Sequence, residues 1–152
     1  MCYNIKQNAA IEPFFSDKGV WAVILGIGID LCNIERMAKA IERPRFLERV
    51  YTPAERARIE AASGVRRSEI AAGLFACKEA VAKALGTGFV GFFADAIEIT
   101  PDDLGRPVCA LAGGALKRAA ELAGDGGFRV WVSITHEEGF AAAQAILERE
   151  NL

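Results

Sequence analysis

The feature that most constrains this chain is a helical segment carrying an acid and a base one turn apart, followed by a glycine-rich loop. The segment spans residues 75–88 and contains Glu79, Lys83 and Gly86. Residues four positions apart share one face of an α-helix, so Glu79 and Lys83 are predicted to project together. Glycines at 86 and 88 can end the helix and let the backbone approach a ligand closely. A carboxylate can hold a hard metal ion and an ammonium can hold phosphate, so the pattern suggests a metal–diphosphate site.

Two simpler interpretations of this segment stay open. Glu79 and Lys83 could form a solvent-exposed ion pair, which contributes only about 0.2–0.5 kcal/mol to a helix. The glycines could form an ordinary helix C-cap rather than a cradle of backbone N–H groups for phosphate. Helical spacing by itself therefore does not establish a functional site.

The remaining patterns predict one domain of mixed α and β structure. The chain has 152 residues, of which 52% are hydrophobic, enough for a single core. We expect residues 1–22 to be an N-terminal extension and residues 23–152 to form one domain. Predicted strands cover residues 20–31, 94–100, a short run ending at 111, 128–135 and 140–147; predicted helices cover residues 34–43, 53–62, 68–85 and 113–123. This order predicts an α+β fold with helices packed against an antiparallel sheet.

Local signals set the boundaries of these elements. Asn33 is a suitable N-cap for the first helix, and Pro44 is expected to interrupt that helix. Thr52 and Glu55 form a capping box with proline at the first helical position. The continuous apolar run before Asp30 predicts a buried strand. A carboxylate at the end of a buried strand is costly unless it is compensated. A metal ion would compensate it, and the alternative is a carboxylate that begins a turn.

Composition excludes several broad classes of function. A net charge of −2 gives no overall footprint for nucleic acid. The longest apolar run, residues 20–29, is too short to span a bilayer and lacks a clear signal-cleavage site, so we expect a cytoplasmic protein. The cysteines form no C-x-x-C pair, and zinc or disulfide frameworks are not expected.

Two further groups of polar residues have open interpretations. Arg36, Lys39 and Arg43 recur on one face of the first predicted helix, as a solvated surface or as a contact for an acidic protein partner. His136 follows the end of a predicted strand, as a structural turn histidine or as a contact to an anionic ligand. In the second case Ser133 and Thr135 would be further donors.

Taken together, three segments resemble the holo-[acyl-carrier-protein] synthase family, the small 4'-phosphopantetheinyl transferases. Residues 26–36 are similar to the family's glycine–x–aspartate strand with an arginine six residues later. Residues 75–88 resemble its F-x-x-K-E-A-x-x-K-A-x-G-T-G signature, and residues 132–136 resemble its strand ending in Thr-His. The resemblance covers roughly residues 24–148.

The resemblance implies a reaction and a magnesium site. The family moves 4'-phosphopantetheine from coenzyme A to a serine of apo acyl carrier protein and releases adenosine 3',5'-bisphosphate. Asp30 and Glu79 match the family's magnesium ligands, and Lys83 matches its lysine at the diphosphate. Glu79, or a water held near it, would help to deprotonate the serine. The carrier protein supplies the nucleophile, so no covalent residue of the enzyme is needed.

The resemblance also implies contacts with both substrates and with other subunits. Gly86, Ser133 and His136 fall where the family contacts coenzyme A. Arg36 and Arg43 fall on the helix that docks the acidic helix of the carrier protein. Family members are typically homotrimers with the site between subunits, in fatty acid or polyketide biosynthesis.

The chain departs from the family in two places, and two rival functions remain to be weighed. Leu74 stands where the family commonly has an arginine that helps to bind phosphate; Arg66 or Arg67 could substitute for it. The extension before residue 23 is the second departure. The rivals are a non-catalytic module that binds a carrier protein or coenzyme A, and an unrelated α+β structural protein. Asp30, Glu79 and Lys83 argue against the first, and the three ordered segments argue against the second.

Overall fold

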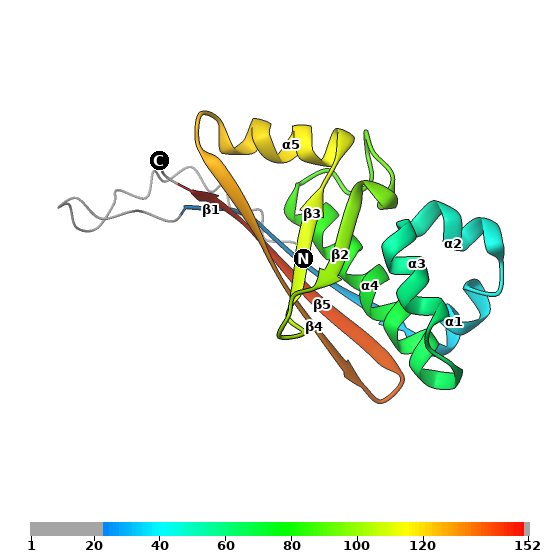
Figure 1. Ribbon diagram of the computed structural model, residues 1–152. Coiled ribbons are helices and arrows are strands. Elements are labelled where there is room, and N and C mark those ends of the chain that lie inside the picture. The colour runs from blue at the N-terminus through cyan, green and yellow to red at the C-terminus, as the bar shows by residue number, and fades with distance from the viewer. Residues whose placement is uncertain (1–22, 151–152) are drawn as a thin grey trace, which may run out of the picture.

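A computed structural model describes residues 23–150 and has two antiparallel sheets with helices packed around them (Figure 1). The larger sheet has the strand order β1-β5-β4, and the smaller one is a β2–β3 hairpin. The strands are β1 (Val23–Asn33), β2 (Ile97–Pro101), β3 (Pro107–Leu111), β4 (Gly127–Glu137) and β5 (Phe140–Glu150). The helices are α1 (Ile34–Ala40), α2 (Pro44–Val50), α3 (Pro53–Glu60), α4 (Gly64–Ala84), the 3₁₀ turn η1 (Ala94–Ala96) and α5 (Gly113–Ala123). This arrangement confirms the predicted α+β fold.

The long helix α4 packs against the larger sheet, and two glycines of β1 make the close approach possible. A Cβ atom built on Gly28 would lie 1.9 Å from the carbonyl oxygen of Ala80. One built on Gly26 would lie equally close to the carbonyl oxygen of Ala84, at 1.9 Å. Only glycine fits at either position, because a backbone oxygen cannot move aside as a flexible side chain can. The second half of α4 is therefore fixed against the middle of β1.

The opposite face of β1 is open, and the prediction of a buried strand is wrong for the single chain. Ile27, Ile29 and Leu31 are 61%, 68% and 62% exposed, respectively. Side chains alternate between the two faces of a strand, and α4 covers only one of them. The run is apolar on both faces although the chain itself buries only one. The start of this predicted strand, residues 20–22, lies outside the described residues.

The first helical region differs from its prediction. The Asn33 side chain accepts a hydrogen bond from the Arg36 N–H at 2.8 Å, which confirms the predicted N-cap. The capped helix ends at Ala40 rather than at residue 43, and the unpredicted helix α2 begins at Pro44. Proline breaks a helix in its interior, but it fits the first position of a helix, where its missing N–H would have no partner. Figure 1 shows α1, α2 and α3 together at one end of the long strands and α5 at the other.

Other boundaries agree with the sequence pattern in kind and differ in extent. The capping box of Thr52 and Glu55 is present. Helix α4 begins at Gly64, four residues before the predicted start at Ser68, and residues 94–96 form a 3₁₀ turn instead of the first part of a strand. The hairpin of β4 and β5 forms as predicted, with both strands longer than expected. No helix within residues 23–150 has the length and apolar character needed to cross a membrane.

Candidate active site

Asp30 and Lys83 come together at the contact between β1 and α4. The Lys83 Nζ atom lies 2.8 Å from Asp30 Oδ1, and it also donates to the carbonyl oxygen of Ile29 at 2.8 Å. Among the ion pairs of residues 23–150, Lys83 pairs with Asp30 and not with Glu79. The interpretation of Glu79 and Lys83 as a simple i,i+4 ion pair is therefore wrong. In the folded chain, Lys83 pairs with a residue that lies 53 positions away in the sequence.

Glu79 is half-buried beside this pair. Burial raises the pKa of its carboxyl group above the ordinary value, and the nearby Asp30 carboxylate raises it further. The Lys83 ammonium acts in the opposite direction on the same pKa. The buried Cys32 thiol responds to both carboxylates, since Asp30 and Glu79 raise its pKa after the larger effect of burial. Asp30, Glu79 and Lys83 therefore form one electrostatic cluster, which we call the acid–lysine cluster.

The donor set of this cluster fits a magnesium ion that is completed by a substrate. Within residues 23–150, no group of three or more His, Cys, Asp or Glu side chains could hold a metal alone. Magnesium usually takes one or two carboxylates and obtains its other oxygens from phosphates and water. Asp30 and Glu79 would supply the two carboxylates; burial raises the pKa of Glu79 above its ordinary value, and repulsion by the Asp30 carboxylate raises it further. A divalent cation would relieve this repulsion.

A cavity of about 430 Å³ opens next to Glu79. Its lining is aromatic and cationic: Arg43, Arg45, Phe46, Arg49, Val50, Phe75, Phe89, Phe93 and Ala94, together with Glu79. The Arg43 guanidinium lies over the Phe46 ring at 5.8 Å from the centroid, and Phe46 lies 6.3 Å from Phe75. We call it the arginine–aromatic cavity. Arg43, predicted as a partner contact on the same helix as Arg36, lines this cavity as the N-cap residue of α2. Arg36 lies outside the cavity and is exposed on α1, so the prediction that the two arginines share one helix face is wrong.

The loop after α4 behaves as a helix C-cap. Gly86 donates its N–H to the carbonyl oxygen of Lys83 at 2.9 Å, and Gly88 donates to that of Ala82 at 3.1 Å. Both glycines have positive φ, +78° and +58°. These two N–H groups are used within the helix end, as the C-cap interpretation predicts, and the contact of Gly86 with coenzyme A stays a prediction. Arg118, which sequence analysis missed, reaches this loop from α5 by donating from Nε to the carbonyl oxygen of Leu85 at 3.1 Å.

His136 lies on the other flank of α4, in a separate cavity of about 160 Å³. This cavity is lined by Arg58, Arg66, Ile70, Gly73, Leu74, Pro101, Gly105, Pro107, Ile134 and His136, and we call it the histidine cavity. The His136 Nε2 atom lies 3.0 Å from the carbonyl oxygen of Glu69. Arg66 lines the cavity and pairs with Glu69 at 3.3 Å, whereas Arg67 lies outside the cavity and pairs with Glu42 at 2.7 Å. Arg58 is a second residue that sequence analysis missed; only its place in the folded chain reveals it.

Ser133 lies on neither flank of α4. It lines a shallow hollow with Ile29, Thr135 and Gln144 on the open face of the larger sheet. The register places Asp30 opposite Ala143 of β5, and Ala143 opposite Ile134 of β4. Strand β5 thus separates the acid–lysine cluster from β4. A single chain does not bring Ser133 or His136 to Asp30, Glu79 and Lys83.

Comparisons with known proteins identify the class of the chain. Residues 26–144 match the 4'-phosphopantetheinyl transferase superfamily, and the chain belongs to this family. The holo-[acyl-carrier-protein] synthase of Clostridium novyi is 47% identical over 131 residues, covering 85% of this chain and 91% of that protein. The enzyme of the same name from Clostridium acetobutylicum is 44% identical over 127 residues, covering 83% of this chain and 98% of that protein.

A solved structure agrees with the sequence relatives. The holo-(acyl-carrier-protein) synthase of Bacillus anthracis, in complex with CoA (3',5'-ADP), superposes with a TM-score of 0.69 at 36% identity. The match covers 82% of this chain and 96% of that structure. The family resemblance and the fold predicted from the sequence are both confirmed.

Proposed function

We propose that this chain is a magnesium-dependent holo-[acyl-carrier-protein] synthase. It transfers 4'-phosphopantetheine from coenzyme A to a serine of apo acyl carrier protein and releases adenosine 3',5'-bisphosphate. The observation that carries the proposal is the acid–lysine cluster, in which the Lys83 ammonium lies 2.8 Å from Asp30 and beside the half-buried Glu79. The family match over residues 26–144 supplies the reaction class.

Each residue of the cluster has a distinct role in this transfer. The serine oxygen forms a bond to the phosphorus that carries pantetheine, and the bond from that phosphorus to the bridging oxygen breaks. Lys83 binds the diphosphate and stabilises the negative charge on the departing bisphosphate. Glu79, or a water that it holds, accepts the serine proton. Asp30 and Glu79 would hold a magnesium ion, which would neutralise charge on the diphosphate.

The histidine cavity is proposed to bind an anionic part of coenzyme A. His136, Arg66 and Arg58 line it, and no acidic side chain is among its lining residues. Leu74 is buried and carries no charge, so the family's arginine has no equivalent at that position. Of the two substitutes suggested by the sequence, Arg66 is the better placed because it lines the histidine cavity, although it also pairs with Glu69 at 3.3 Å; Arg67 is not among the lining residues. Arg58 adds a second guanidinium to this group.

The carrier protein is proposed to dock on Arg36 and Arg43. Arg43 lines the arginine–aromatic cavity, which opens beside Glu79, and Arg36 is exposed on α1. An acidic helix bound to these guanidinium groups would place its serine near the acid–lysine cluster. Electrostatic complementarity of this kind steers encounter and fixes the orientation of the partner.

We propose a homotrimer in which neighbouring subunits complete the site. The open face of the larger sheet exposes Ile27, Ile29 and Leu31, an apolar surface that favours burial in a subunit interface. Ser133 lies on this face, and His136 lies across α4 from the acid–lysine cluster. One molecule of coenzyme A would contact Lys83 and Gly86 of one subunit and Ser133 and His136 of the next. A cytoplasmic location and a role in fatty acid or polyketide biosynthesis agree with this assignment.

The proposal is tested by mass spectrometry of apo acyl carrier protein incubated with this protein, coenzyme A and magnesium, with and without a chelator. Transfer predicts a chelator-sensitive gain of about 340 Da, the mass of the phosphopantetheine arm moved by metal-assisted phosphoryl transfer. No gain with several carrier proteins, despite a folded sample, would favour a non-catalytic binding module. The loss of the family's arginine at Leu74 would then be the first feature to examine.

A further inference from the structure

A fully buried lysine precedes Glu79 in the sequence and takes no part in the acid–lysine cluster. The side chains of Lys78 on α4 and Glu55 on α3 are both 0% exposed, and Lys78 Nζ lies 2.7 Å from Glu55 Oε2. A buried ion pair often adds little net stability, because its attraction must first offset the cost of removing two charges from water. Its position next to Glu79 suggests a role beyond stability.

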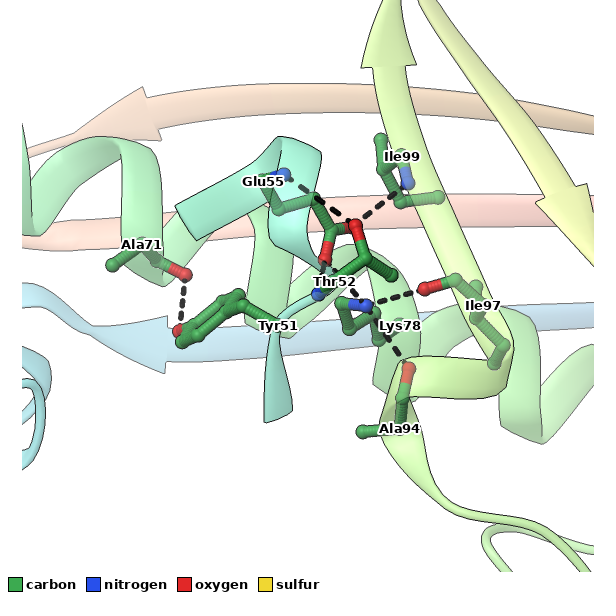
Figure 2. Close-up of polar contacts among 8 residues, drawn as sticks. All are labelled: Tyr51, Thr52, Glu55, Ala71, Lys78, Ala94, Ile97 and Ile99. Atoms are coloured by element: carbon green, nitrogen blue, oxygen red, sulfur yellow. Dashed lines mark hydrogen bonds and ion pairs between the residues drawn. The ribbon is translucent and has the colours of Figure 1, made fainter. Parts of the chain in front are cut away.

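The Lys78 ammonium group has a hydrogen-bond acceptor for each of its protons. Besides the Glu55 carboxylate, Lys78 Nζ donates to the carbonyl oxygen of Ala94 at 2.9 Å and to that of Ile97 (Figure 2). An ammonium group has three donor protons, so every one of them has a partner. Ala94 belongs to η1 and Ile97 begins β2. The side chain therefore ties α4 to the segment that comes after the glycine-rich loop.

The glutamate is held as firmly as the lysine. Its carboxylate accepts a hydrogen bond from the Thr52 N–H at 2.8 Å and another from the Ile99 N–H at 2.8 Å. The Tyr51 hydroxyl donates to the carbonyl oxygen of Ala71 at 2.9 Å, a second link between the start of α3 and α4 (Figure 2). Glu55 thus fixes the place at which the lysine ammonium must sit.

The position of the Lys78 ammonium affects two parts of the candidate site, namely the Glu79 side chain and the loop that follows α4. Lys78 and Glu79 are adjacent on α4, so the direction of one side chain sets that of the other, about 100° further around the helix. The loop of residues 85–93 runs from the end of α4 to Ala94, where Lys78 holds it. This loop carries Phe89 and Phe93, which line the arginine–aromatic cavity.

We infer that Glu55 and Lys78 form a positioning pair for this site. Lys78 fixes the rotation of α4 about its axis, so that the Glu79 side chain points towards Asp30. It also anchors the end of the loop of residues 85–93, which lines the arginine–aromatic cavity. Neither residue touches the reacting atoms in this role. The kinetic consequence rests on the proposed transfer reaction, whereas the structural consequence, the order of residues 85–93, does not.

The test compares three variants with the wild-type chain. Glu55→Gln keeps the shape of the side chain and removes the charge that fixes Lys78. The double variant E55L/K78M replaces the whole pair by apolar groups, which avoids leaving one buried charge unpaired. Thr52→Ala is the matched control, because it removes the capping hydroxyl that accepts from the Glu55 N–H but keeps the Thr52 N–H that binds the carboxylate.

Two readouts separate positioning from stability. In steady-state transfer, Glu55→Gln and E55L/K78M are expected to lower kcat about tenfold and to raise the half-saturating magnesium concentration by a similar factor, since small displacements of positioned groups have large effects. In amide hydrogen exchange, residues 85–93 are expected to exchange about tenfold faster in both variants. Thr52→Ala is expected to lower the unfolding temperature while leaving both readouts at wild-type values.

Each outcome decides a different part of the inference. If either folded variant retains both the wild-type magnesium requirement and the wild-type exchange of residues 85–93, the positioning role is refuted. Unfolding of both variants would assign the pair to stability alone and would equally overturn the inference. If the wild-type chain transfers nothing but loop exchange changes as expected, the proposed function fails and the structural role of the pair stands.

Discussion

Replacing the Glu79 carboxylate by an amide should reduce activity and leave stability unharmed. Glu79→Gln keeps the volume of the side chain but removes one of the two negative charges proposed to hold magnesium. Loss of one preorganised electrostatic contact to a transition state typically lowers kcat about 100- to 1,000-fold, or roughly 3–4 kcal/mol. We expect a reduction in this range, together with a higher magnesium requirement.

The expected effect on stability comes from the raised pKa of Glu79. Burial and the Asp30 carboxylate raise this pKa above its unfolded value, so the folded state binds the proton more tightly than the unfolded state. The ionised carboxylate therefore destabilises the fold at pH values above the folded pKa. This penalty disappears as the pH falls below the unfolded pKa. Glu79→Gln should consequently match or exceed the wild-type unfolding temperature at pH 8 and lose any advantage at pH 4, near the ordinary value for a glutamate.

Transfer is measured by mass spectrometry of the carrier protein, and unfolding by calorimetry at both pH values. Glu60→Gln is the matched control, because Glu60 is an exposed carboxylate in the last turn of α3. It should change neither measurement. Wild-type transfer rates in Glu79→Gln would refute the proposed metal ligand. A marked loss of stability at pH 8 would show that the carboxylate supports the fold, contrary to the direction of its pKa.

Four further outcomes are expected. Arg36→Glu should weaken binding of the carrier protein about tenfold or more in a binding titration, with little change for coenzyme A; equal losses would contradict the docking surface. Gly28→Ala should lower the free energy of unfolding by about 3 kcal/mol or more in a urea titration, because the added Cβ would lie 1.9 Å from a backbone oxygen of α4. Ile29→Lys should shift the sedimentation coefficient towards that of a monomer, since it puts a charge on the open apolar face. Arg66→Gln should raise the KM for coenzyme A more than Arg67→Gln does, because only Arg66 lines the histidine cavity; similar effects would remove it as a phosphate contact.

Much of the fold was predictable from short-range patterns. The capping box at Thr52, the N-cap at Asn33 and the β4–β5 hairpin depend on residues close together in the sequence, and all three are present. Helix α2 was missed because Pro44 is compatible both with the end of one helix and with the start of the next. The open face of β1 was missed for a different reason. An apolar run shows which side chains avoid water, but not which face the same chain will cover.

The sequence was enough to select residues of the candidate site, but it did not predict how they are arranged. The signature of residues 75–88 was enough to select Glu79 and Lys83, because their types and spacing are properties of the sequence. It did not show that Lys83 would pair with Asp30, nor that the neighbouring Lys78 would be buried with Glu55. Lys78 is therefore fully buried, whereas Lys83, five positions later on the same helix, is partly exposed.

The sequence alone determined the family and the order of most helices and strands, and it selected the residues that are proposed to bind metal and phosphate. These properties depend on residue type and on spacing within one helix or strand. The tertiary structure decided that the N–H groups of Gly86 and Gly88 close the helix, that Arg66 rather than Arg67 accompanies His136, and that His136 lies across α4 from Glu79. Helical periodicity fixes which residues share a face, whereas packing between distant segments determines what that face meets.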